Sequence, residues 1–178
     1  EGKREAEMFD VFEPVNRNPY FHKQPDGSLR HESDICGDKA IEFVRGAQDA
    51  QPWCLSVSFN AAHAEDNDKE NHFPFPPSEA GFYEGVTIPP PLVDTDFWQT
   101  LPEFFHNGMH RERYFWRWDT PEKYQRNVKA YYRMITGLDR NIGRVLKELA
   151  RRGMADNTVV IFMGDNGYYK ASRGFAGK

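Results

Sequence analysis

The chain has 178 residues, of which 39% are hydrophobic and 28% charged, which suits one globular domain with a sizeable core. Its net charge of −4, from 27 acidic and 23 basic residues, argues against a general nucleic-acid-binding surface or an anionic-membrane surface. No apolar run approaches the roughly 20 residues of a membrane-spanning helix. The sequence opens on a charged stretch without an initiator Met or a signal peptide, and we interpret it as a mature product or an excised piece.

The first regular elements are expected after a polar stretch, residues 1–32, that contains turn signals only. The segment "SDICGDKAIEFVRGAQDA" predicts a helix at about 34–48 with Ser33 or Asp34 as its N-cap, because apolar side chains recur at roughly helical spacing. The next segment, "QPWCLSVSF", predicts a strand at 53–59. Its nearly continuous apolar run suits a central strand that is buried on both faces.

The two cysteines, Cys36 and Cys54, fall in this helix and this strand. Neither has the spacing of a metal ligand. A disulfide between them stays open, and two buried free thiols are favoured.

The segment 60–119 is rich in proline and aromatic residues but shows few signals of regular structure. Because long structureless loops are uncommon in compact domains, two interpretations stay open: one wall of a substrate cleft, or an ordered insertion over the sheet. Aromatic residues make up 15% of the chain, which suggests ring-stacking surfaces for carbohydrate, although filling of the core is the favoured explanation.

The clearest helix follows in "DTPEKYQRNVKAYYRMITGLDRNIGRVLKELARRG". Thr120 can cap it, Pro121 suits its first position and Gly153 can end it. Its apolar residues form one stripe: Tyr131, Met134, Ile135, Leu138, Ile142, Val145, Leu146 and Leu149. A strand at 158–163 comes next, so that helix, strand, loop, helix and strand alternate. This order is typical of a parallel α/β sheet.

The last predicted strand ends in Gly-Asp-Asn-Gly, which includes Asp165 and Asn166. In open α/β sheets, ligands bind beyond the carboxyl ends of the strands. A carboxylate and an amide carbonyl are hard oxygen ligands, suited to Ca²⁺ or Mg²⁺ rather than to zinc. The tetrapeptide alone is weak support for a metal site, since Asn-Gly turns end many strands.

The segment "LDRNIGRVLKELARRGMADNTVVIFMGDNGYY", followed by "RGFAGK", closely resembles the type I sulfatases of the alkaline-phosphatase superfamily. A second resemblance lies in "CLSVSFNAAHAED", and together they cover about the last third of the chain and residues 53–66. The resemblance implies an α/β fold, part of a mainly parallel sheet flanked by helices and incomplete in this chain. Residues 1–178 would then be part of one sulfatase catalytic domain that lacks its N-terminal third and its C-terminal region.

The same resemblance assigns roles to particular residues. Asp165 and Asn166 match half of a metal site, usually for calcium, although magnesium is also possible. Lys178 matches a lysine that contacts the sulfate and steadies the leaving oxygen. His63 matches a histidine that can donate a proton or a hydrogen bond to the leaving group. Arg173 stands where it could contact an anionic substrate or merely pair with a surface acid.

The chain departs from the family pattern at several positions. Ala62 replaces a usual proline and Gly164 a commoner serine, and both changes look tolerable. Lys170 falls where relatives mostly carry leucine, and its role is open. Neither Cys36 nor Cys54 begins the Cys/Ser-x-Pro/Ala-x-Arg motif from which the family's formylglycine nucleophile is made.

We therefore expect a parent protein that is a sulfuric ester hydrolase acting on a sulfated small molecule or glycan, and an isolated chain that is inactive. Two alternatives stay open: a non-catalytic module that binds an anion or associates with itself through exposed sheet edges, and a phosphodiesterase or phosphonate hydrolase of the same superfamily. Those relatives favour Asp-His-Gly, so Asn166 favours a sulfatase. Family habit suggests a periplasmic or secreted location, and neither nucleic acid nor membrane is an expected partner.

Overall fold

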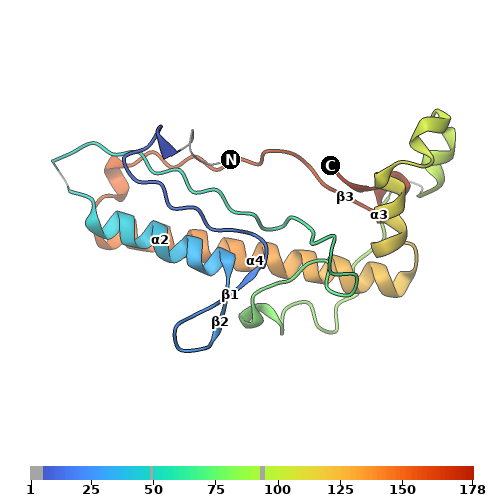
Figure 1. Ribbon diagram of the computed structural model, residues 1–178, viewed down its shortest axis with the longest axis horizontal. Coiled ribbons are helices and arrows are strands. Elements are labelled where there is room, and N and C mark those ends of the chain that lie inside the picture. Colours follow the sequence, from blue (N-terminus) through green and yellow to red (C-terminus); the bar gives the residue numbers. More distant parts are fainter. Residues whose placement is uncertain (1–5, 49, 93–94) are drawn as a thin grey trace. The chain divides into compact units, whose positions relative to one another are not determined.

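The computed structural model describes residues 6–48, 50–92 and 95–178. They divide into two compact units: the first comes from 1–60 and 138–158, and the second from 61–137 and 159–178. Helix α4, Pro121–Arg151, contributes residues to both units. In Figure 1 it is the long helix that runs from yellow to orange.

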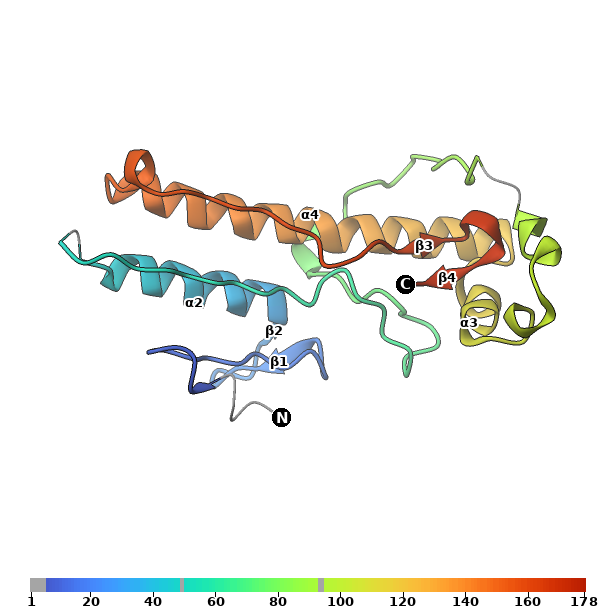
Figure 2. The same cartoon turned by 90° about the horizontal axis from the view of Figure 1, so that it is seen from above.

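The first unit begins with an antiparallel hairpin of β1 (Phe21–Lys23) and β2 (Leu29–His31), in which Phe21 is paired with His31. Gly27, with φ of +85°, provides the left-handed residue of the turn. Helix α2 (Glu32–Gly46) follows directly and lies beside the C-terminal half of α4 (Figures 1 and 2). This confirms the predicted helix. Its N-cap is His31 rather than Ser33 or Asp34, because the His31 ring accepts a hydrogen bond from the Ser33 backbone N–H at 3.2 Å.

The core of the first unit lies where α2, α4 and residues 53–55 meet. Val44, Leu149 and Met154 are buried there, and Trp53, Leu55 and Val145 pack against them. Ion pairs reinforce the contact between the helices: Arg140 binds Asp34 at 2.7 Å, and Arg144 binds Asp38 at 2.5 Å. Helix α4 begins and ends as predicted, because the Thr120 hydroxyl accepts from the Lys123 backbone N–H at 3.2 Å and Gly153 has φ of +70°.

The second unit combines the N-terminal half of α4 with short elements of the aromatic segment. These are the 3₁₀ turns η1 (Pro77–Glu79), η2 (Thr95–Thr100) and η3 (Glu103–Phe105) and the helix α3 (Met109–Arg117), which the sequence did not predict. Phe73 is 1% exposed and contacts the rings of Trp118, Tyr131 and Tyr168. The aromatic residues therefore build much of this core, as favoured above.

The predicted strands at 53–59 and 158–163 are the main difference from expectation. Neither segment pairs in a ladder with any described residue, and both are irregular, with a 3₁₀ turn η4 at Ala155–Asn157 before the second. Residues 159–163 are apolar yet exposed, with Ile161 at 75% and Phe162 at 77%. A strand needs partners for its backbone groups, and an apolar sequence alone does not supply them. The pairs that do form, β1–β2 and β3–β4, are antiparallel.

The cysteines are free thiols, as favoured. Cys36 is buried in α2, where burial raises the pKa of its thiol to about 12 and the neighbouring Glu32 carboxylate adds to this effect. The expectation of burial is wrong for Cys54, which is exposed because its predicted strand is not covered on both faces by described residues.

Candidate functional site

The turn that carries Asp165 and Asn166 lies on the surface of the second unit. Both side chains are exposed. The Asn166 Nδ2 donates to the Gly167 carbonyl at 2.7 Å, so that its Oδ1 is left as the acceptor of the amide. The two predicted metal ligands therefore offer one carboxylate and one amide oxygen from neighbouring residues, a donor set that fits Ca²⁺ or Mg²⁺.

Lys178 directly follows the short ribbon of β3 (Tyr169–Lys170) and β4 (Ala176–Gly177). The strands are antiparallel, with Tyr169 paired with Gly177. Because antiparallel strands bring the start of one beside the end of the other, Lys178 lies opposite the residue that precedes β3, two positions after Asn166. The predicted sulfate contact and the predicted metal ligands thus share one end of one ribbon.

Helix α3 holds this ribbon in place through side chains that bind its backbone. His110 donates from Nδ1 to the Ala176 carbonyl at 2.9 Å, and the buried Arg111 donates to the Gly174 carbonyl. Gly177 has φ of +100°, and a Cβ at this position would lie 3.3 Å from the His110 Nδ1. Glycine is therefore required directly before Lys178 both for its backbone conformation and for the close approach of α3.

His63 lies on a loop of the same unit and is half-buried. Its Nδ1 is 2.7 Å from the Ala64 carbonyl, and since a carbonyl can only accept, Nδ1 carries the hydrogen. Proton exchange with a substrate would then use Nε2. The loop is closed by the Glu65 backbone N–H, which donates to the His72 carbonyl at 2.8 Å.

The loop of His63 is tied to α3 by Asp66, a residue that the sequence reasoning did not select. The Asp66 carboxylate accepts from Arg113 at 2.6 and 3.0 Å and from Arg117. Burial alone would raise the pKa of Asp66, but hydrogen bonds from the two guanidinium groups outweigh it and hold this pKa below its ordinary value. The available signal was the spacing of Arg113 and Arg117, which are four residues apart and share one face of a helix.

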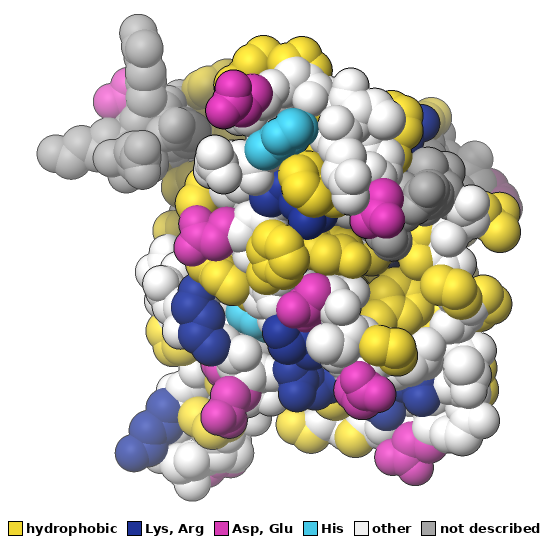
Figure 3. All heavy atoms as spheres, turned by 90° about the vertical axis from the view of Figure 1, so that its right-hand side faces the viewer, with side chains coloured by type: hydrophobic (Ala, Val, Ile, Leu, Met, Phe, Trp, Pro, Cys, Tyr) yellow, Lys and Arg dark blue, Asp and Glu magenta, His cyan; other side chains and the backbone are white. Residues whose placement is uncertain are grey.

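The remaining cations of the C-terminal segment contact aromatic rings. The Arg173 guanidinium lies 5.2 Å from the centre of the Phe97 ring, and its role toward a substrate stays a prediction. The Lys170 Nζ lies 3.3 Å from the Tyr132 hydroxyl and 5.0 Å from the centre of the Tyr131 ring. Figure 3 shows one face of the molecule, on which cationic, anionic and hydrophobic side chains are interspersed rather than gathered into a patch of one charge.

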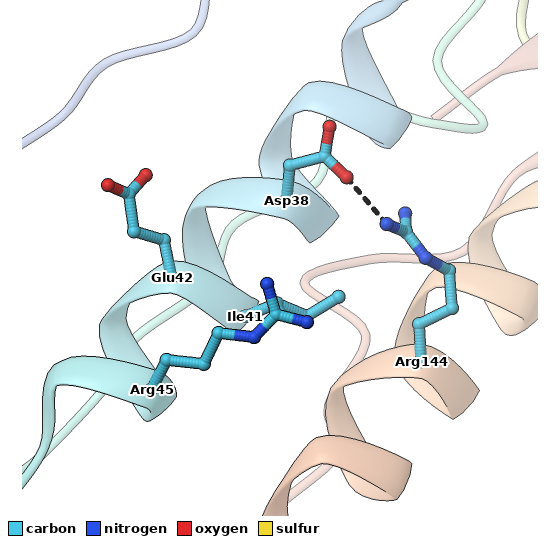
Figure 4. Close-up of a pocket in the computed structure, with 5 residues that line it drawn as sticks. All are labelled: Asp38, Ile41, Glu42, Arg45 and Arg144. Carbon is cyan, nitrogen blue, oxygen red and sulfur yellow. Dashed lines mark hydrogen bonds and ion pairs between the residues drawn. The ribbon is translucent and has the colours of Figure 1, made fainter.

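A separate pocket lies in the first unit between α2 and α4, with a volume of about 380 Å³. Figure 4 shows Asp38 turned toward Arg144, while Glu42 and Arg45 project from the same face of α2. Asp38 also binds Arg30 at 2.5 Å. Both arginines that line the pocket are engaged in ion pairs, Arg144 with Asp38 and Arg45 with Glu148, so the pocket has the character of a polar helix contact rather than of an anion site.

No three His, Cys, Asp or Glu side chains gather as a metal cluster among residues 6–48, 50–92 and 95–178. In the same described ranges, no helix combines the length and the apolarity needed to cross a membrane.

The comparison with known families identifies the class of protein. A family model described as "Sulfatase" matches residues 4–176, so nearly the whole chain belongs to the sulfatase family. The family has an α/β fold of the alkaline-phosphatase type and is the family expected from the sequence motifs.

Individual relatives support this membership. The chain is 23% identical to an N-acetylglucosamine-6-O-sulfatase of Bacteroides thetaiotaomicron over 83% of its own length and 35% of the relative's. It is 25% identical to an arylsulfatase of Clostridium perfringens, over 77% of the chain and 26% of the relative. It is 26% identical to a choline-sulfatase of Rhizobium meliloti, over 79% and 26%. The chain thus spans only 26–35% of the length of these relatives.

Proposed function

We propose that the complete gene product containing this chain hydrolyses sulfate esters, with sulfated carbohydrates as the substrate class. Membership of the sulfatase family supports sulfuric ester hydrolysis at the family level. The observation that supports the assignment to this chain is the ribbon β3–β4, because Lys178 follows its last residue and the turn of Asp165 and Asn166 precedes its first strand. A cation beside a pair of hard oxygen ligands suits an anionic substrate.

Each predicted residue has a role in this proposal. Asp165 and the Asn166 Oδ1 would hold a divalent metal, Ca²⁺ or Mg²⁺, which when bound screens the sulfate oxygens and acts as a Lewis acid. Lys178 would contact a sulfate oxygen, and Arg173 would add a second cationic contact. His63 would donate a proton from Nε2 of its doubly protonated ring to the leaving oxygen, because its Nδ1–H is engaged with the Ala64 carbonyl.

The attacking group would come from formylglycine supplied by a segment other than this one. Neither Cys36, in "CGDKA", nor Cys54, in "CLSVS", begins the motif that is converted to it. We therefore expect the isolated chain to bind substrate weakly and to release no sulfate. Following family habit, the complete protein would act in the periplasm or outside the cell.

The test is sulfate release from 4-nitrophenyl sulfate by the complete gene product. Loss of a metal contribution of several kcal/mol predicts that Asp165→Ala lowers kcat/KM by about 100-fold or more. Asp156→Ala, at an exposed acid on the 3₁₀ turn η4, is the matched control and should leave the rate unchanged. Equal rates for both variants would refute the assignment of Asp165.

A phosphodiesterase of the same superfamily is the second candidate, and Asn166 argues against it. All three relatives described above are sulfatases. Faster cleavage of bis(4-nitrophenyl) phosphate than of the aryl sulfate would reverse this preference. Sulfate release by the isolated chain would likewise overturn the proposal that its nucleophile lies elsewhere.

A further inference from the structure

Asp66, on the loop of His63, and Tyr168, which follows the turn of Asp165 and Asn166, contact the same buried side chain. The Arg117 side chain is 1% exposed, and its Nη2 donates to the Asp66 Oδ1, three residues after His63. Its Nη1 lies 3.4 Å from the hydroxyl of Tyr168, two residues after Asn166. One planar guanidinium therefore bridges two segments that are about a hundred residues apart in the sequence.

The charges around Arg117 favour this bridge. Arg113 and Arg117 share the Asp66 carboxylate, which leaves one net positive charge for the three groups. The Tyr168 oxygen can accept a hydrogen bond from the Arg117 guanidinium without neutralising the excess positive charge.

The Tyr168 ring and the end of α3 at Arg117 are both held by their surroundings. The Tyr168 ring stacks on Tyr131, with centres 5.7 Å apart, and meets the edge of Phe73 at 6.0 Å. The Asn127 Nδ2 donates to the Arg117 carbonyl at 2.9 Å, which fixes the end of α3 against α4. Since neither ring nor helix end can shift freely in this packed core, a displacement of one loop is transmitted to the other.

We propose that Arg117 is a positioning residue that couples the His63 loop to the turn of Asp165 and Asn166. It sets the proton donor and the metal ligands in one fixed relation without touching the substrate. The catalytic meaning of this coupling rests on the function proposed above, whereas the mechanical coupling can be measured without any activity.

The first experiment measures backbone amide exchange in the chain by mass spectrometry. Tyr168→Phe removes only the hydroxyl and keeps the stacked ring, so it should speed exchange about fivefold in peptides from both 61–68 and 164–171. Tyr83→Phe is the matched control, because it removes a hydroxyl bonded to Thr136 at 2.8 Å in the same unit. The coupling is refuted if Tyr168→Phe leaves peptide 61–68 as protected as the control does, or if exchange rises equally along 121–137.

The second experiment uses a double-mutant cycle on the same readout. Arg117→Met keeps Asp66 paired with Arg113 and removes the bridge. If the two loops communicate through Arg117, adding Tyr168→Phe to Arg117→Met gives no further increase in exchange. If the increases in exchange rate of the two single variants multiplied in the double variant, the two side chains would act independently and the proposal would be overturned.

The third experiment measures kinetics in the complete gene product. Tyr168→Phe should lower kcat for 4-nitrophenyl sulfate by about tenfold and raise the half-activating metal concentration, with a smaller change in KM. An inactive wild-type protein would refute the proposed function while leaving the exchange result in force. An active wild-type protein whose kcat and metal requirement are unchanged by Tyr168→Phe would refute the positioning role.

Discussion

Gly37 on α2 lies so close to α4 that replacing it with alanine should destabilise the first unit. A Cβ at this position would lie 2.6 Å from the Asn141 Oδ1 and 3.2 Å from the Asn141 Cβ. Asn141 is fully buried and cannot simply rotate away. Its Nδ2 donates to Asp34 at 2.9 Å, and its Oδ1 accepts from Arg144 at 2.8 Å.

The magnitude follows from two opposing effects. Alanine is favoured over glycine inside a helix by about 0.8–1.0 kcal/mol. Overpacking of a tight contact costs about 1–3 kcal/mol, and a displaced buried hydrogen bond adds roughly 1 kcal/mol. The overpacking and hydrogen-bond costs exceed the gain in helix propensity, so Gly37→Ala should lower the free energy of unfolding by about 1–3 kcal/mol.

Gly143 provides the matched control. It lies inside α4, has nothing within 4 Å of its Cβ position, and belongs to the same unit. Gly143→Ala should therefore show the helix-forming gain alone and raise stability by about 0.5–1 kcal/mol. The pair of variants isolates the contact with Asn141 from the general effect of alanine.

The assay is urea unfolding followed by far-ultraviolet circular dichroism, which reports on α2 and α4. With a slope of about 2 kcal/mol per molar urea, Gly37→Ala should lower the midpoint by roughly 0.5–1.5 M and Gly143→Ala should raise it by roughly 0.2–0.5 M. If Gly37→Ala were as stabilising as Gly143→Ala, the close contact of α2 with Asn141 would not exist in the folded chain.

Three further predictions concern acid, association and thiol chemistry. Because the folded pKa of Asp66 is depressed, its contribution to stability is complete above the unfolded pKa of about 3.9 and is lost as the pH falls through the lower folded pKa. The difference in urea midpoint between the wild type and Asp66→Asn should therefore stay constant from pH 7 to 5 and shrink toward pH 2. A difference that grows in acid would contradict this sign. Ile161→Lys should reduce self-association of the chain, measured by sedimentation velocity, because it places a charge in the exposed apolar segment 159–163, and the exposed Gln51→Lys is a control that adds the same single positive charge elsewhere and should not. Iodoacetamide at pH 8 should modify Cys54 within minutes and leave Cys36 unmodified, as read by peptide mass, since the latter thiol is buried with a pKa of about 12; equal labelling would disprove its burial.

The elements that were predicted correctly are those whose signals are local. Thr120, Pro121 and Gly153 mark the ends of α4 through contacts within a few residues, so that sequence alone places them. Strand pairing depends on partners distant in the chain, and the apolar segment 158–163 forms no ladder with any described residue. Its hydrophobic character favoured a buried strand, whereas residues 159–163 are exposed, because strand formation depends on neighbouring strands and not on the segment alone.

The candidate site shows the same division. The motif at Asp165 and Asn166 and the family resemblance named candidate residues whose roles stay predictions, whereas the buried bridge through Arg117 was missed. Arg117 is separated from each of its contacts, Asp66 and Tyr168, by 51 residues, so no local pattern reveals them. An arginine-rich, aromatic helix inside a predicted loop was the signal available, and it became meaningful only with the packing of the second unit.

The exposed segment 159–163 has a thermodynamic consequence for the turn that follows it. On its C-terminal side the turn is anchored by Tyr168 and the ribbon, but on its N-terminal side it continues from apolar residues without a ladder partner among the described ones. Anything that pairs with 159–163 would restrict Asp165 and Asn166 before a metal arrives. If pairing of 159–163 raises the metal affinity by some factor, linkage requires that a bound metal raises the affinity of that pairing by the same factor. The cation would then stabilise the strand pairing as well as bind to the turn.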